Sequence, residues 1–393
     1  MRTFRSLRHR NYRLYFIGQL VSLIGSWTQM TALMWLAYDL TKTASWPALL
    51  TAMQIGPSFL LAVWAGHLAD RFSRRRLIAF TQSAFLACAI ALLGLYAVGA
   101  LNKWVMLAVM LIHGVIQSID IPARLAFIPG LVAREDLANA VALNSLLFNA
   151  ARAVGPALAG ALLGTVGAGG CFLVNTLSYL AVLLALGLMQ LPSNGGAVEE
   201  GNPKGGFHVL AGQPGMLTLV LLAGLAAIGG WPLLALLPSF AAQELGGEET
   251  AYGTLLSAVG VGALGAALTA ATLGHDVRQK VLLAGGLILV CGALLGLAAA
   301  GSLAVATGCC AAFGYGMILF FATAQSAVQL GTADADRGKV MGIWAMMLSA
   351  GVPMGNLVFG PAADAVASVR PVIAVQAGIL ALAAAILMVR KVK

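Results

Sequence analysis

The sequence predicts an all-α polytopic membrane protein with twelve transmembrane helices, arranged as two six-helix bundles. The first observation is composition: of 393 residues, 60% are hydrophobic and only 9% are charged, and the mean hydropathy is +0.91. A soluble domain usually carries about 25% charged residues, so water is not the main solvent for this surface. The second observation is a series of long apolar runs, and the third is a polar stretch that divides the chain into nearly equal halves.

The apolar runs are long enough to form membrane-spanning helices. A helix needs about 20 predominantly apolar residues to cross the hydrocarbon of a bilayer. Runs of this length, separated by charges or by Gly/Pro breaks, fall at 12–38, 45–69, 77–100, 103–128, 138–164, 170–190, 213–240, 251–273, 281–299, 302–330, 340–363 and 371–389. We therefore expect one helix in each run.

Basic residues between the runs predict the orientation of the chain. A net charge of +9 would suggest nucleic-acid binding in a soluble protein, but here the charges form short clusters between apolar runs. With the N-terminus inside, most of the 23 Lys and Arg residues fall in cytoplasmic segments, and the outer loops hold only Lys42, Lys103 and Arg370. This pattern predicts a multi-pass protein of the bacterial inner membrane with both termini in the cytoplasm.

The longest polar interval, 191–212, is rich in Gly and Pro and predicts a flexible cytoplasmic linker. It separates an N-terminal six-helix bundle, 1–190, from a C-terminal six-helix bundle, 213–393. The two halves also resemble each other at an offset of 200 residues, at which Gly155 corresponds to Gly355.

The loop after the second run carries the sequence GHLADRFSRRR at 66–76. It resembles the signature loop of the major facilitator superfamily, although Ser73 stands where the family has Gly. The resemblance implies the major facilitator fold, with a substrate site near the bilayer midplane between two halves that rock around it. It also implies that this loop, with Gly66, Asp70, Arg71 and Arg74, gates the conformational change and does not touch substrate.

Several segments of the first half are similar to one branch of that superfamily, the enterobactin exporters and macrolide efflux proteins. They include Asp120-Ile121-Pro122-Ala123-Arg124 and the opening Leu7-Arg8-His9-Arg10-Asn11-Tyr12-Arg13-Leu14. In addition, Gly155-Pro156 resembles the antiporter motif of the fifth helix, which would make this helix a pivot for exchange. An ordinary packing kink at Pro156 explains the same residues.

Polar residues at helical spacing predict a cavity, because polar groups inside hydrocarbon are costly. Several stripes of this kind lie in the first half, and isolated amides lie in the second half beside Trp231, Phe320, Trp344 and Tyr252. One interpretation is that these aromatic residues form an apolar wall of the cavity, and the other is that each of them faces lipid or packs in the core. The predicted cavity residues are Gln19, Ser22, Gln29, His113, Gln117, Asn149, Gln325 and Asn356.

Three charges inside apolar runs are the candidates for coupling: Asp120, Arg124 and Arg152. A carboxylate in hydrocarbon either pairs with an arginine or is driven towards protonation by desolvation. One hypothesis is that Asp120 alternates between pairing with Arg124 or Arg152 and carrying a proton. The other is a permanent structural ion pair between neighbouring helices. Arg152 is also a candidate for attracting an anionic substrate.

These observations favour a transporter over an enzyme, because the sequence has no Ser-His-Asp group, no metal-ligand set and no Walker-type glycine loop. We expect a monomeric secondary active transporter without cofactors, driven by the proton gradient and not by ATP. With the resemblance, they predict an antiporter that exports a small amphiphilic molecule, such as a siderophore or drug, by alternating access. A lipid or lysophospholipid flippase of the same fold and a facilitated uniporter are the alternatives.

Overall fold

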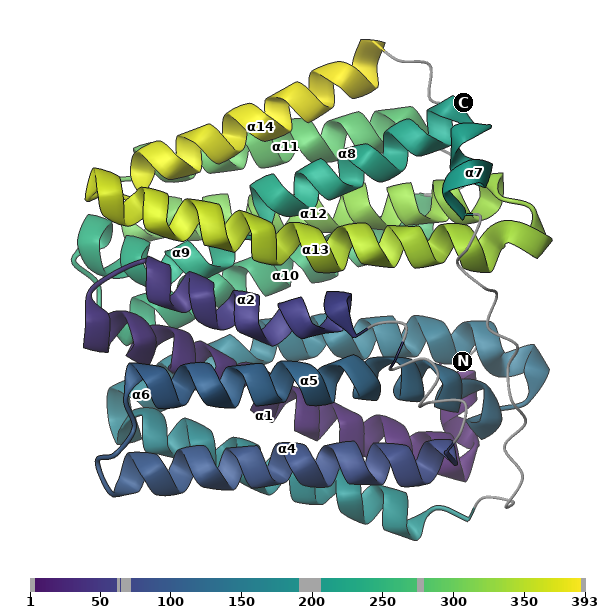
Figure 1. Ribbon diagram of the computed structural model, residues 1–393, viewed down its shortest axis with the longest axis horizontal. Coiled ribbons are helices and arrows are strands. Elements are labelled where there is room, and N and C mark those ends of the chain that lie inside the picture. The colour runs from purple at the N-terminus through teal and green to yellow at the C-terminus, as the bar shows by residue number, and fades with distance from the viewer. Residues whose placement is uncertain (1–3, 62–63, 65–71, 191–205, 274–278, 390–393) are drawn as a thin grey trace. The chain divides into compact units, whose positions relative to one another are not determined.

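The computed structural model describes residues 4–61, 64, 72–190, 206–273 and 279–389 (Figure 1). The described residues form helices joined by short turns. The helices are α1 (Arg10–Thr41), α2 (Ser45–Leu60), α4 (Arg74–Ala97), α5 (Lys103–Phe127), α6 (Leu137–Leu188), α7 (Gly206–Ala211), α8 (Pro214–Gly230), α9 (Leu233–Ser239), α10 (Glu249–Leu273), α11 (Gln279–Ala299), α12 (Leu303–Gly331), α13 (Asp334–Val366) and α14 (Arg370–Val389). The predicted all-α fold class is confirmed.

Ten helical segments of the described chain are long and apolar enough to cross a membrane. One of them, Arg134–Leu188, is 55 residues long and contains two of the predicted runs. The chain breaks direction inside it at Gly167, whose φ of 72° is costly for any residue with a Cβ. The described part of α2, Ser45–Leu60, covers the first part of the predicted run 45–69. These helices account for the twelve predicted spans.

The predicted run 213–240 is interrupted in the structure. Helix α8 ends at Gly230, α9 begins at Leu233, and a π-helical turn follows at Phe240–Glu244. Pro232 and Pro238 explain the irregularity, because proline cannot donate the backbone hydrogen bond that a regular helix needs.

Contacts divide the chain into two compact units. The first unit holds Met1–Thr41 and Met53–Val198, and the second holds Lys42–Ala52 and Glu199–Lys393. The first turns of α2 are therefore counted with the second unit. The predicted boundaries at 1–190, 191–212 and 213–393 stay predictions, because most of the linker lies outside the described residues.

The beginning of α2 is held by a carboxylate from α13. Asp364 accepts hydrogen bonds from the backbone N–H of Ala44 (2.6 Å), from the backbone N–H of Ser45 (3.0 Å) and from the Ser45 hydroxyl. A Cβ at Gly360 would lie 2.7 Å from the Cβ of Ala48, so the glycine allows the two helices to meet. A residue 319 positions away thus caps this helix end.

In the first unit, α1 packs against α6, and α4 packs against both α5 and α6 (Figure 1). Small residues make this packing close. A Cβ at Gly25 of α1 would lie 2.2 Å from the Ser178 hydroxyl of α6, and a Cβ at Gly155 of α6 would lie 2.4 Å from the Cβ of Trp27. Such contacts suit helices in lipid, where packing and not hydrophobic exclusion drives association.

In the second unit, α12 packs against α10 and α11, while α8 packs against α13 and α14. A Cβ at Gly314 of α12 would lie 2.0 Å from the carbonyl oxygen of Val259 on α10. At one end of this unit, Arg370 binds the Glu244 carboxylate and the carbonyl oxygens of Ala298 and Ala300 (both 2.8 Å). This arginine joins the start of α14 to the π-helical turn and to the end of α11.

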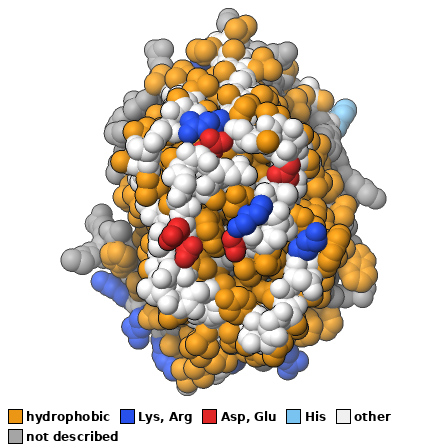
Figure 2. All heavy atoms as spheres, turned by 90° about the vertical axis from the view of Figure 1, so that its left-hand side faces the viewer, with side chains coloured by type: hydrophobic (Ala, Val, Ile, Leu, Met, Phe, Trp, Pro, Cys, Tyr) orange, Lys and Arg blue, Asp and Glu red, His pale blue; other side chains and the backbone are white. Residues whose placement is uncertain are grey.

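Hydrophobic side chains cover much of the outside of the protein. Leu184 on α6 is 66% exposed and Leu268 on α10 is 57% exposed. Figure 2 shows the side of the molecule that lies at the left in Figure 1, where apolar side chains surround a small number of charged ones. Exposed apolar side chains along the helices are expected where lipid is the solvent.

Candidate functional site

Asp120 lies in the middle of the polar network of the first unit. Its side chain is fully buried on α5. It forms an ion pair with Arg124, one turn further along the same helix. It also accepts hydrogen bonds from the Thr81 hydroxyl (2.6 Å) and the Gln82 amide (2.9 Å) of α4. The carboxylate therefore connects α5 to α4, a partner that the sequence analysis did not include.

Arg124 extends this network to a third helix. Its Nη1 donates a hydrogen bond to Oε1 of Gln19 on α1 (2.7 Å), and its Nη2 pairs with the Asp120 carboxylate. Removing two charges from water is costly, and the cost is offset only where the ions pair and their remaining hydrogen bonds are made. Thr81, Gln82 and Gln19 supply such bonds.

Arg152, the third candidate charge, lies on α6. Its guanidinium carbon is 5.3 Å from the ring centroid of Trp27 on α1, within the range of a cation–π interaction. Asp120 pairs with Arg124 in this structure, and an exchange with Arg152 stays a prediction. The arrangement places an arginine and an indole together where α1 meets α6.

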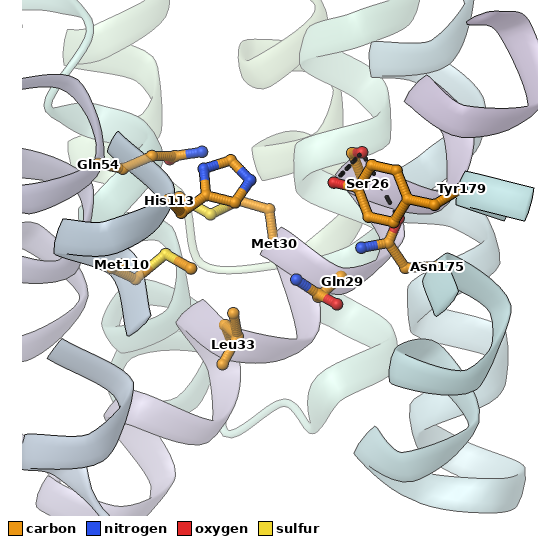
Figure 3. A pocket seen from close by; sticks show the side chains of 9 residues that line it. All are labelled: Ser26, Gln29, Met30, Leu33, Gln54, Met110, His113, Asn175 and Tyr179. Atoms are coloured by element: carbon orange, nitrogen blue, oxygen red, sulfur yellow. Dashed lines mark hydrogen bonds between the residues drawn. The ribbon is translucent and has the colours of Figure 1, made fainter. Parts of the chain in front are cut away.

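A small pocket lies inside the first unit, among α1, α2, α5 and α6 (Figure 3). Its volume is about 30 Å³, enough for a water molecule. Its lining is Ser26, Gln29, Met30, Leu33, Gln54, Met110, His113, Asn175 and Tyr179. The Ser26 hydroxyl lies 3.2 Å from the Tyr179 hydroxyl, and these two groups form one side of the pocket.

The pocket is lined by residues that were predicted to line a cavity and by residues that were not predicted. Gln29 and His113 belong to the predicted cavity stripes. Gln54, Asn175 and Tyr179 come from runs that were interpreted only as apolar spans. The spacing of Asn175 and Tyr179, four residues apart in a run of apolar residues, is the signal that could have identified them.

The other predicted cavity residues of the first unit have different environments. Ser22 is buried, and its carbonyl oxygen accepts a hydrogen bond from Ser26. Gln117 is half-buried, one turn before Asp120 on α5. The amide of Asn149 donates to the carbonyl oxygen of Ser145 on its own helix (2.9 Å).

In the second unit, three of the four predicted aromatic residues form a cluster, and the fourth, Tyr252, is buried on α10. Trp231 stacks on Phe321, with ring centroids 5.9 Å apart, and Phe321 meets both Phe320 (5.4 Å) and Trp344 (6.4 Å). Phe321, which the sequence analysis did not single out, is the residue that connects them. Of the two amides predicted in this half, Gln325 is exposed on α12, and Asn356 is buried on α13.

The predicted gating residues are only partly described. Gly66, Asp70 and Arg71 lie outside the described residues. Arg74 begins α4 and donates a hydrogen bond to the carbonyl oxygen of Ala126 at the end of α5 (2.9 Å). Pro156 is buried inside α6, beside the glycine that packs against Trp27.

Comparison with known proteins decides the family. The model of the transmembrane secretion effector family matches residues 1–393. The chain belongs to this family of the major facilitator superfamily. It is a multi-pass membrane protein and a transporter, not an enzyme.

Two named relatives match nearly the whole chain. The staphyloferrin A transporter of Staphylococcus aureus is 25% identical over 370 residues, which are 91% of this chain and 90% of the relative. The enterobactin exporter EntS of Escherichia coli O1:K1 is 26% identical over 366 residues, which are 90% of this chain and 85% of the relative. The similarity to the enterobactin-exporter branch is confirmed.

Solved structures share the fold. An inward-facing bacterial homologue of the lysosomal transporter Spinster aligns with a TM-score of 0.76 at 14% identity and covers 96% of both chains. An inward-facing bacterial homologue of the iron transporter ferroportin aligns with a TM-score of 0.75 at 17% identity, covering 96% of this chain and 98% of that chain. At these identities the likeness establishes the major facilitator fold alone.

Proposed function

We propose that this transporter is a proton-coupled antiporter that exports a small amphiphilic molecule, such as a siderophore, across the bacterial inner membrane by alternating access. The names of the two relatives support the class of substrate, since one is a staphyloferrin A transporter and the other an enterobactin exporter. Both termini would lie in the cytoplasm, as the distribution of basic residues predicts.

The observation that carries the coupling proposal is the buried Asp120. This carboxylate is fully buried in a membrane-spanning helix, and one arginine balances its charge. Proton uptake by Asp120 would remove its negative charge and leave Arg124 with the neutral Gln19 as partner. The stability of the α1, α4 and α5 contacts would then depend on protonation. This dependence is what links a proton to a conformational state.

The side chains available for a substrate differ between the two units. In the first unit, Arg152 beside Trp27 supplies a positive charge with an aromatic face, which suits an anionic group. In the second unit, the cluster around Phe321 is apolar and aromatic, and Phe320, Phe321 and Trp344 are buried in it. Arg152 beside Trp27 thus supports a substrate with an anionic part.

The test is transport in proteoliposomes with an imposed pH gradient. Purified protein is reconstituted, and movement of enterobactin, staphyloferrin A and a fluorescent lysophospholipid is measured with and without the gradient. We expect gradient-dependent movement of a siderophore, and we expect Asp120→Asn to abolish the dependence on the gradient. Asp336→Asn is the matched control, because Asp336 also pairs with a cation, Lys339 (2.8 Å), but at a partly exposed position.

Three results would contradict the proposal in different ways. Siderophore transport that ignores the gradient in the unmodified protein would indicate a uniporter. Transport of the lysophospholipid without either siderophore would indicate a flippase. Full gradient dependence in Asp120→Asn would remove Asp120 from the coupling mechanism.

A further inference from the structure

The pocket inside the first unit contains polar atoms that lack partners. Oε1 of Gln29, Nδ1 of His113 and Nδ2 of Asn175 are buried, and none of them has a hydrogen-bond partner within the described part of the chain. Gln29 is 4% exposed and Asn175 is fully buried. Figure 3 shows these side chains around the space between α1, α5 and α6. Buried polar groups are almost always satisfied, so this pocket needs an occupant that can donate and accept.

The size and chemistry of the pocket select water as that occupant. A volume of about 30 Å³ admits water but excludes a siderophore or a drug. The lining contains amides, hydroxyls and an imidazole but no carboxylate, so a bound metal cation would have no counter-charge there. A water molecule there would donate a hydrogen bond to Oε1 of Gln29, accept one from Nδ2 of Asn175 and bond to Nδ1 of His113.

A polar track leads from this pocket to Asp120. His113, Gln117 and Asp120 are spaced by four and three residues along α5, which places them on one face of the helix. Two further buried amide oxygens, Oε1 of Gln117 on α5 and Oε1 of Gln82 on α4, have no hydrogen-bond partner in the described residues. The amide of Gln82 already binds Asp120. Amides do not titrate here, but they can orient water between a donor and an acceptor.

We propose that the pocket among α1, α2, α5 and α6 is a hydrated proton relay, through which His113 and water bound by Gln29 and Asn175 deliver protons to Asp120. This inference deepens the proposed function and rests on its proton coupling. All the residues that line this route belong to the first unit.

The proton transfer balances without any further reactant. The N–H bond of the protonated His113 imidazole breaks, the proton passes through bound water that the Gln117 amide orients, and an O–H bond forms on the Asp120 carboxylate. The imidazole returns to its neutral form, the carboxyl group becomes neutral, and Arg124 keeps its charge. The ion pair between Asp120 and Arg124 is broken by this step.

The charged and titratable groups around His113 come from its own helix and from α6. Asp120 and Arg124 of its own helix act on it electrostatically. From α6, the titratable neighbour is Tyr179, which lines the pocket. From α4, Phe85 lies 4.4 Å away between ring centroids. The groups that α1 and α2 contribute to the pocket are uncharged, and they include Gln29 and Gln54.

The test follows the protonation of Asp120 directly, without substrate. Infrared difference spectroscopy of the reconstituted protein after a rapid pH drop detects the C=O band of a protonated carboxyl group, and the band assigned to Asp120 is the one lost in Asp120→Asn. We expect His113→Leu and Asn175→Leu each to slow the appearance of this band at least tenfold. Thr176→Val is the control, since its hydroxyl bonds the Phe172 carbonyl of its own helix (2.8 Å) and the pocket lining does not include it.

The two pocket variants guard against a folding defect, because they alter different helices and each is checked by thermal unfolding. An unchanged rate in both would overturn the relay, as would the absence of an Asp120 band in the unmodified protein. If transport depends on the proton gradient but the Asp120 band appears at an unchanged rate in both variants, the relay is rejected and the proposed function is supported. If the Asp120 band appears more slowly in both variants but transport does not depend on the proton gradient, the relay is supported and the proposed function is rejected.

Discussion

Arg124 binds the carboxylate of Asp120 one turn earlier on α5 and simultaneously donates a hydrogen bond to Gln19 of α1. One arginine therefore neutralises a fully buried acid and joins two helices of the first unit. The ion pair itself lies within a single helix, so movement of a neighbouring helix does not separate its two charges. Only the bonds to Gln19, Thr81 and Gln82 would change when α1 or α4 shifts.

Replacing the arginine of this pair should destabilise the protein strongly. Arg124→Met leaves Asp120 buried without its counter-charge, and breaking a buried pair in this way costs about 3–5 kcal/mol. The melting temperature in detergent, measured by intrinsic fluorescence, should fall accordingly. The double variant Asp120→Leu/Arg124→Met should recover most of the loss. Lys339→Met, which breaks a partly exposed pair with Asp336, should cost about 1 kcal/mol or less. An equally small loss for both single variants would contradict this reading of the buried pair.

The packing of α12 against α10 depends on a glycine. In Gly314→Ala the new Cβ would meet the backbone carbonyl of Val259 at 2.0 Å, and a backbone atom cannot move away as a flexible side chain can. We expect a loss of about 1–3 kcal/mol from overpacking. Gly292→Ala on α11 is the matched control, because its Cβ would meet no atom within 4 Å. Alanine also favours the helix by up to about 1 kcal/mol over glycine, so this control should be neutral or slightly stabilising. Thermal unfolding of the two variants side by side tests the prediction, and equal melting temperatures would refute it.

Asp364 should control the stability of the first turn of α2. Asp364→Ala removes the acceptor for two backbone N–H groups and one hydroxyl at Ala44 and Ser45, and the loss of such a cap costs about 1–2 kcal/mol. Hydrogen exchange should accelerate at 44–48. Asn102→Ala is a reciprocal control, because Asn102 caps α5 by accepting from the N–H groups of Trp104 and Val105. It should accelerate exchange at 104–106 and leave 44–48 unchanged. The opposite pattern, or no change at 44–48 in Asp364→Ala, would show that the cap is not what protects this turn.

Arg370 should not tolerate lysine. Its guanidinium binds the Glu244 carboxylate and two carbonyl oxygens, at Ala298 and Ala300, in directions that a planar fork can satisfy at once. A lysine ammonium keeps the charge but cannot reproduce these three directions. We expect Arg370→Lys to lose about 1–3 kcal/mol, because at least one of the partly buried carbonyls or the carboxylate loses its donor. A melting temperature equal to that of the unmodified protein would mean that charge alone matters at this position.

Local sequence was sufficient to predict the spans and the breaks between them, but not the break between α8 and α9 inside 213–240. Hydropathy sums over about 20 neighbouring residues, so it places a helix whatever packs against it. The break predicted between 164 and 170 corresponds to the kink at Gly167, and the signature of the loop at 66–76 indicated the family. The spacing of His113, Gln117, Asp120 and Arg124 in the sequence is also sufficient to place them on one face of a helix.

The partners of those residues required the tertiary structure. Spacing alone allowed Asp120 to pair with Arg124 or Arg152, and it could not identify Thr81 and Gln82 on α4 as further donors. The pocket likewise combines Gln54, His113 and Asn175 from three helices. Which side chains converge depends on how far each helix is rotated about its axis.

The sequence by itself therefore determined the membrane spans, the family and the polar face of α5. Only the tertiary structure decided the capping of α2 by Asp364, the ion pair of Asp120 and the residues around the pocket. The physical reason is the range of the interactions. Hydropathy and helical periodicity act between residues close in the chain. Rotation and contact between helices are set by shape at positions such as Gly25 and Ser178, which lie far apart in the sequence and meet only when the bundle has formed.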